Sequence, residues 1–209
     1  MRHTLLVAAA AACLLVPRPA PAQTFSLGVR AGAMRSQIAS GSERRPRNGF
    51  TGGLAGRFRL TSRVALQVET VYSQKGWASG ETGLLLDYLE SPILVRFSAP
   101  RWGEGLIVSA LAGGSVATEV RCRWRRSVYF NSPPAEASCI GARDKRHDFG
   151  FVAALELERR LSPGYGTFEV RYVHGTTNLA PSGSVLRNRS FVLLLGFALD
   201  LPPRRRAAA

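Results

Sequence analysis

The sequence lacks any apolar run long enough to cross a bilayer as a helix. Its longest run is the twelve residues from Leu5 to Val16, whereas a membrane-spanning helix needs about 20. If this chain enters a membrane, it must therefore do so as strands. Lysine is also scarce, because Lys75 and Lys145 are the only two among 28 basic residues, so arginine carries almost all of the positive charge. The composition, 45% hydrophobic and 20% charged, excludes an intrinsically disordered chain.

The start of the chain has the features of a secretory signal peptide. Arg2 precedes the apolar run, and the small-x-small sequence Ala20-Pro21-Ala22 follows it. These features are typical of a signal peptide, and we expect cleavage before Gln23. A lipoprotein signal ending at Cys13 is disfavoured, because the apolar run continues beyond that residue. The predicted divisions are a signal peptide at 1–22, a barrel at 23–201 and a basic tail at 202–209.

Cysteine is rare as well, since removal of the signal peptide leaves only Cys122 and Cys139. An even pair in an exported chain predicts a disulfide. A metal site would need more ligands nearby than His147 alone, so we expect no metal. The sequence contains no phosphate-binding glycine loop, and we expect no cofactor.

The mature chain shows eight stretches of alternating apolar and polar residues, which predicts an all-β fold. The odd-numbered connections between these stretches are long and the even-numbered ones short, as in a barrel with one extracellular and one periplasmic end. We therefore predict an eight-stranded antiparallel up-and-down transmembrane β-barrel that is integral to the cell outer membrane. The predicted strands are residues 24–35, 49–60, 64–75, 84–97, 106 to at least 118, 148–159, 165–173 and 189–201.

Alternation defines two faces of the barrel wall, but it does not say which face is inside. One face is apolar, and the other combines charged residues with glycines. Long arginine side chains suit the crowded lumen of an eight-stranded barrel, and arginine pairs with buried carboxylates better than lysine does. We therefore place the charged face inside and the apolar face against lipid. The predicted lumen charge network is Arg30, Arg57, Arg59, Glu69, Glu90, Arg96, Glu156, Glu169 and Arg171.

The third long connection, residues 119–147, is the most distinctive basic segment of a chain whose net charge is +14. Counting alternate positions from Leu106 and back from Phe149 puts both mature cysteines on the outer face. The positive surplus attracts polyanions, and lipopolysaccharide phosphates are the nearest ones, while export argues against nucleic acid. A solvated hairpin without a ligand explains the same residues equally well. The candidate polyanion-binding residues are Arg121, Arg123, Arg125, Arg126, Arg143, Lys145 and Arg146.

Several segments resemble a known family. They are Tyr72-Ser73-Gln74-Lys75-Gly76, Tyr88-Leu89-Glu90-Ser91-Pro92, Asp148-Phe149-Gly150 and Glu169-Val170-Arg171-Tyr172. These segments are similar to the signatures of the outer-membrane β-barrel domain family, the porin-like or PorT-type small barrels, and the resemblance spans essentially the whole mature chain. It implies location and architecture, with outer-membrane lipid around the barrel and the barrel-assembly machinery as a partner during biogenesis. The last strand departs from the family by ending on Leu199 and Leu201 instead of an aromatic residue.

Architecture alone does not give the function. We favour a non-enzymatic scaffold or binding module with a plugged lumen and basic extracellular loops, and we expect no catalytic residues. One alternative is a lipid A-modifying membrane esterase, which needs a serine activated by a histidine. His174 is its only candidate histidine, and Ser182 and Ser184 have no geometric case beside it. The other alternative is a soluble periplasmic ligand-binding β-barrel, which requires the opposite assignment of the two faces.

Overall fold

The computed structural model describes residues 24–39, 45–79, 82–103, 105–126, 135–139, 146–178 and 187–201. The predicted signal peptide and the predicted basic tail both lie outside these residues. Within the described ranges, no helix is long and apolar enough to span a membrane.

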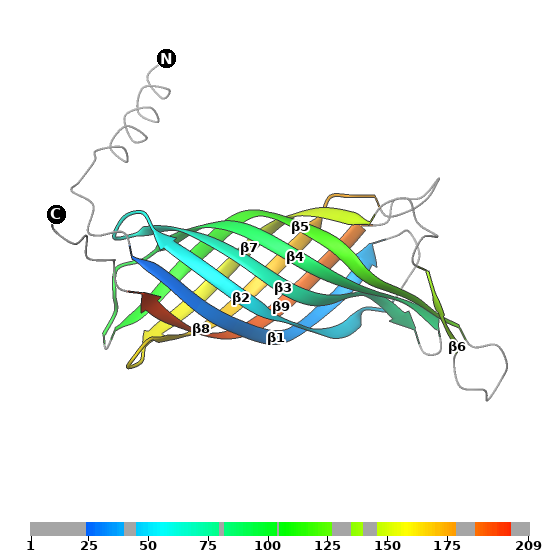
Figure 1. Ribbon diagram of the computed structural model, residues 1–209, viewed down its shortest axis with the longest axis horizontal. Helices are drawn as coiled ribbons and strands as arrows, with labels where there is room; N and C mark the ends of the chain where they lie inside the picture. Colours follow the sequence, from blue (N-terminus) through cyan, green and yellow to red (C-terminus); the bar gives the residue numbers. More distant parts are fainter. Residues whose placement is uncertain are drawn as a thin grey trace, which may run out of the picture.

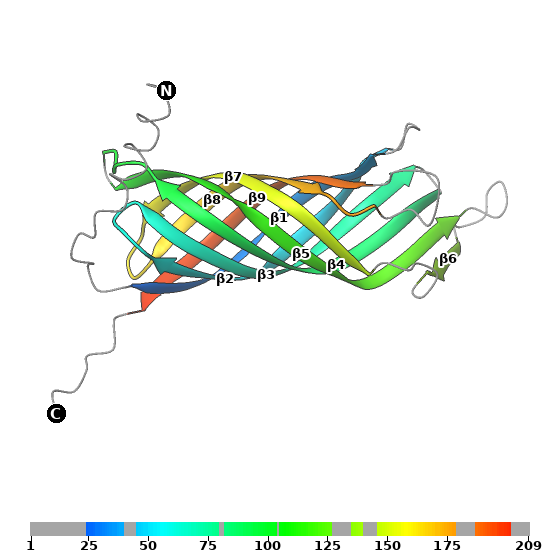
Figure 2. The same ribbon diagram turned by 90° about the horizontal axis from the view of Figure 1, so that it is seen from above.

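The described residues form nine strands, which are β1 (Phe25–Ala39), β2 (Arg47–Arg59), β3 (Val64–Ser79), β4 (Thr82–Ser98), β5 (Leu106–Arg126), β6 (Ala135–Ser138), β7 (His147–Arg160), β8 (Tyr165–Gly175) and β9 (Arg187–Leu201). Each long strand pairs antiparallel with its neighbours in the chain. The pairing of β1 with β9 closes the sheet into a barrel of eight strands, seen from two sides in Figures 1 and 2. The remaining short strand, β6, lies outside the barrel and pairs with the far end of β5.

The predicted eight-stranded antiparallel barrel is confirmed, although several strands are longer than predicted. β1 continues to Ala39, β3 to Ser79 and β5 to Arg126, all toward the end with the long connections. Antiparallel hydrogen bonding needs no apolar face, so the ladders continue beyond the segments where alternation marks a strand. The short strand β6 was not predicted, because its sequence Ala-Glu-Ala-Ser has no strand signal.

The side-chain faces are arranged as predicted, with charge inside and apolar residues outside. Phe151 and Leu195 are each 67% exposed, whereas Glu69 is 1% exposed. On β9, outward apolar residues run from Phe191 to Leu201. Ten residue steps at about 3.3 Å cover about 33 Å along the strand, and a tilt of about 40° reduces that to about 25 Å, the height of an outer-membrane apolar band. The soluble alternative is therefore wrong, because it requires the apolar face inside.

Glycines on the inner face allow neighbouring strands to lie close together. A Cβ atom on Gly113 would lie 2.0 Å from the carbonyl oxygen of Ile93 on the next strand. A larger residue could not be accommodated there without moving the backbone. Because inward glycines have no side chain, they leave room in the lumen for the long charged side chains of other strands.

Candidate functional site

The centre of the lumen is built around Arg30, which β1 points inward. Its guanidinium donates to Glu69 at 2.9 Å, to Glu169 at 2.8 Å and to Glu156 at 3.2 Å. These carboxylates come from β3, β8 and β7. Because β7 is three strands away from β1 around the barrel, this one side chain links opposite walls.

A second arginine, Arg171, completes this central layer. It donates to the two carboxylate oxygens of Glu69 at 2.7 and 2.9 Å, and it also pairs with Glu169 on its own strand. The Gln67 amide donates to Glu69 at 2.7 Å. Both oxygens of Glu69 are therefore satisfied, as a buried carboxylate requires.

Toward the end where β1 begins, two further arginines share two glutamates. Arg57 donates to Glu156 at 2.9 Å and to Glu158 at 2.6 Å. Arg96 pairs with both of the same carboxylates, at 3.0 Å in the case of Glu158. Glu156 thus receives hydrogen bonds from arginines on β1, β2 and β4.

In the described part of the chain, this network contains four arginines and four glutamates and is formally neutral. Each of its side chains is at most 8% exposed. Charges buried in this way lose hydration, and the loss is offset only when each is paired and hydrogen-bonded. Here every charged side chain has a partner of opposite charge. Charged side chains can therefore fill the lumen without an excess of either sign.

The network observed differs in part from the one predicted. The structure brings together Arg30, Arg57, Glu69, Arg96, Glu156, Glu169 and Arg171. Glu90 is placed elsewhere, in a separate pair with Lys75 and a hydrogen bond from Ser73 at 3.2 Å. Arg59 is only partly buried and lines a cavity at the barrel mouth. Glu158 was not predicted, although it lies two residues after Glu156 and therefore on the same face.

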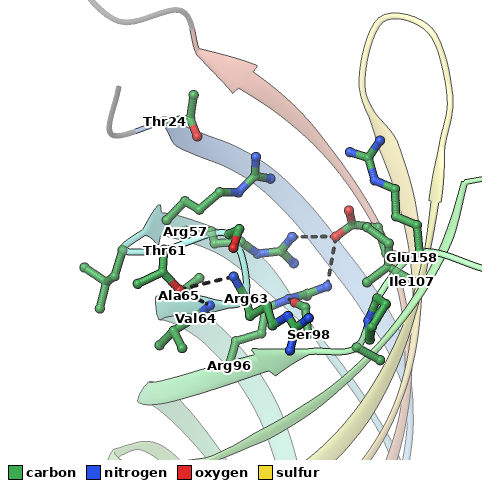
Figure 3. A pocket seen from close by; sticks show the side chains of 16 residues that line it. Thr24, Arg57, Thr61, Arg63, Val64, Ala65, Arg96, Ser98, Ile107 and Glu158 are labelled. Atoms are coloured by element: carbon green, nitrogen blue, oxygen red, sulfur yellow. Dashed lines mark hydrogen bonds and ion pairs between the residues drawn. The ribbon is translucent and has the colours of Figure 1, made fainter. Parts of the chain in front are cut away.

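The mouth cavity lies at the end with the short turns, which in outer-membrane barrels faces the periplasm. It has a volume of about 480 Å³, and Arg59, Arg63 and Arg101 contribute to its lining. Figure 3 shows its inner end, where Arg57 and Arg96 converge on Glu158. The cavity therefore ends at the charge network. A separate small cavity, lined in part by Arg30 and Gln67, has a volume of about 10 Å³, which is about one water molecule.

The opposite end of the lumen is filled by an apolar cluster, composed of Ile38, Leu84, Leu86, Tyr88, Ala117, Cys122 and Cys139 with Trp77 packed against it. The predicted disulfide between Cys122 and Cys139 is present, with a Cα–Cα distance of 5.1 Å. Both cysteines are buried on the inner side, at 1% and 2% exposure. The predicted outer-face position was wrong, and for Cys122 the reason is that Val120 is an extra residue on β5.

That extra residue forms a bulge between β4 and β5. Asp87 is opposite Arg121 and the next residue, Tyr88, is opposite Glu119, so Val120 has no partner. A bulge of this kind reverses which face the following residues occupy. Cys122, an even-numbered position, therefore points inward although the even-numbered residues of β5 before the bulge point outward. The alternation of the sequence gives no sign of this insertion.

Beyond the bulge, β5 and β6 form a basic hairpin that extends past the end of the barrel (Figure 2). Arg123 and Arg125 donate to Glu136 at 2.6 and 2.9 Å. The hydrogen bond from Arg125, reinforced by Arg123, lowers the pKa of Glu136 below its usual value. Glu136 therefore partly neutralises two of the candidate polyanion-binding residues.

The other candidate polyanion-binding residues differ in their surroundings. Arg126 and Arg146 are exposed. Arg121 is also exposed, with its Nε atom 4.0 Å from a buried oxygen of Asp87. Arg143 and Lys145 lie outside the described residues.

The structure gives no support to the histidine proposed for an esterase. His174 is on the outer wall of β8, with its ring 6.4 Å from that of Tyr172, and Ser182 and Ser184 lie outside the described residues. Across the described ranges, no group of three or more histidine, cysteine or acidic side chains could hold a metal ion.

Comparison with known proteins assigns the family. Residues 21–180 match the outer membrane protein beta-barrel domain, and the chain belongs to that family. It is an integral outer-membrane β-barrel protein. No curated protein matches it.

Solved structures share the fold at low sequence identity. Neisserial surface protein A (NspA) is 11% identical, with a TM-score of 0.52 over 85% of this chain and 97% of NspA. The outer membrane protein OprG of Pseudomonas aeruginosa is also 11% identical, with a TM-score of 0.51 over 86% of this chain and 97% of OprG. Ail, the attachment invasion locus protein of Yersinia pestis, solved in complex with the heparin analogue sucrose octasulfate, has 11% identity and a TM-score of 0.47, covering 84% of this chain and 99% of Ail. The similarities to NspA and OprG define the fold alone.

Proposed function

We propose that this protein is a non-enzymatic outer-membrane scaffold or binding module whose lumen is closed to solutes. The observation that carries the proposal is the neutral arginine–glutamate network across the lumen. Arg30 alone contacts carboxylates from three other strands, and every side chain of the network is at most 8% exposed. A hydrated ion cannot pass this network unless several ion pairs separate together.

The proposal also assigns a binding role to the extracellular hairpin of β5 and β6. Arg121 and Arg126 are exposed there, without a hydrogen bond to Glu136. Exposed positive charge attracts polyanions, with an attraction that falls as salt is added. We therefore assign Arg121 and Arg126 the principal role among the candidate polyanion-binding residues of the hairpin.

Planar-bilayer recording tests the closed lumen. The wild-type barrel should give no stable channel openings. A charge-balanced double variant, Arg96→Ala with Glu158→Ala, removes a pair at the inner end of the mouth cavity and should produce measurable ion leakage. The matched control, Arg123→Ala with Glu136→Ala, removes a pair from the hairpin and should remain silent. Large, long-lived channels in the wild-type protein would refute the proposal.

A further inference from the structure

The outer wall changes from apolar to polar at matching positions on four neighbouring strands. Moving toward the extracellular end, Phe50 is followed by Asn48 on β2, Ala33 by Arg35 on β1, Phe191 by Arg189 on β9 and Tyr172 by His174 on β8. Strand register makes neighbours of these positions, since Arg35 is opposite Asn48 and Phe191, and Arg189 is opposite His174. The apolar band of an outer-membrane barrel ends where lipid headgroups begin. The polar positions therefore lie at the level of the outer-leaflet headgroups.

The two arginines at this boundary are close enough to act together. Arg189 is directly opposite Gln37, and Arg35 is directly opposite Phe191. Arg35 and Arg189 are therefore diagonal neighbours, separated by about 7–8 Å at the backbone, which is within reach of long side chains. Both are exposed on the outer face.

A shallow hollow lies between these side chains, lined by Arg35, Gln37, Pro46, Arg189, Ser190 and Phe191. Its volume is about 210 Å³, below the roughly 300–1,000 Å³ of pockets for drug-sized ligands. The hollow therefore suits one charged group of a larger molecule rather than a whole ligand. Below it, Phe191 and Tyr172 pack with ring centroids 5.2 Å apart, which provides an apolar surface beside the charged one.

The electrostatic setting of these arginines differs from that of the lumen arginines. Among the residues that the structure describes, no carboxylate lies within ion-pair distance of Arg35 or Arg189. Guanidinium groups bind phosphate through paired, charge-assisted hydrogen bonds. Two of them beside the Gln37 amide form a suitable set of donors for one phosphate group.

We propose that Arg35 and Arg189, assisted by Gln37, bind a phosphate of the phosphorylated glycolipid in the outer leaflet. The location selects the lipid as the source of the phosphate, because both side chains point outward at the edge of the apolar band. The aromatic pair Phe191 and Tyr172 then contacts the less polar part of the same lipid. This site lies on a different part of the barrel from the β5–β6 hairpin, and it does not depend on whether the lumen is closed.

Native mass spectrometry of the folded full chain in detergent micelles tests the site with bis-phosphorylated lipid A as the probe. The double variant Arg35→Gln with Arg189→Gln should bind lipid A at least tenfold more weakly than wild type, and each single variant about threefold more weakly. Dephosphorylated lipid A should bind the wild type as weakly as lipid A binds the double variant. The double variant should keep its heat-modifiable gel migration, because both substituted side chains are exposed.

A matched control carries the same loss of charge at the other end of the barrel. Arg63→Gln with Arg101→Gln changes the periplasmic mouth and should retain wild-type affinity for lipid A. The proposal is overturned if the Arg35 and Arg189 variant binds as tightly as wild type, or if the mouth variant loses as much affinity as the Arg35 and Arg189 variant. It is also overturned if millimolar inorganic phosphate displaces lipid A, since the site would then accept free phosphate instead.

Discussion

At the scale of single residues, Glu156 is the most heavily shared charge of the lumen. Arg30, Arg57 and Arg96 all pair with it, and its side chain has no exposed surface. One carboxylate therefore compensates part of the charge of three arginines from three strands. Losing it leaves the buried positive charge of these arginines without the partner that they share.

Substitution of Glu156 by Gln is expected to destabilise the barrel by about 3–5 kcal/mol, the usual cost of removing one partner from a buried ion pair. Urea unfolding of the protein in lipid vesicles measures this change. Glu136→Gln is the control, because that carboxylate also binds two arginines but is exposed on the hairpin, where ion pairs contribute little. Equal stability of the two variants would show that burial adds nothing to the lumen network.

At the scale of elements, the basic hairpin depends on one inserted residue and one disulfide. The bulge at Val120 turns Cys122 inward, and the bond to Cys139 holds β6 against β5. In the chain-entropy description, closing a loop of this size contributes about 3 kcal/mol. The hairpin therefore presents its exposed arginines from a fixed position beyond the membrane.

The hairpin should bind a soluble polyanion such as dextran sulfate, and Arg121→Gln with Arg126→Gln should weaken that binding several-fold at low salt. The effect should shrink as salt is added, because screening shortens the range of the attraction to about 8 Å at physiological ionic strength. Fluorescence titration of the folded barrel measures both changes. The control variant, Arg63→Gln with Arg101→Gln, removes the same number of positive charges from the other end of the barrel. An equal loss of affinity in that variant would contradict a specific role for the hairpin.

The sequence predicts the barrel well because alternation is a local signal that each strand carries by itself. It predicts the inward charged residues for the same reason, and Glu158 could have been included by counting two residues from Glu156. It does not predict that Glu90 pairs with Lys75, since that choice depends on how far apart charges lie in the closed lumen. The inward turn of Cys122 was missed because a bulge adds one residue without disturbing composition or hydropathy.

At the scale of the whole molecule, the outward apolar band shows that the surroundings of the barrel wall are lipid and not water. Leu195 is 67% exposed near the middle of this band on β9, and Leu201 lies at its periplasmic edge. In water, such exposed leucines would tolerate polar substitution. In a bilayer, the cost depends on depth.

Leu195→Arg is therefore expected to destabilise the folded barrel by about 2–4 kcal/mol, and Leu201→Arg by about 0–1 kcal/mol. Equilibrium folding into lipid vesicles across a urea series measures both values. If the two substitutions had the same small effect, the middle of this wall would not face hydrocarbon.

The charge network also constrains the order in which the barrel can be built. Its members come from β1, β2, β3, β4, β7 and β8, and Arg30 on the first strand finds carboxylates on β3, β7 and β8. The earliest strand to emerge therefore carries a cation that is fully compensated only after β7 and β8 have arrived. Insertion of one hairpin at a time would bring arginines without a carboxylate partner into the hydrocarbon core of the membrane. The barrel must therefore be completed as a single cooperative event.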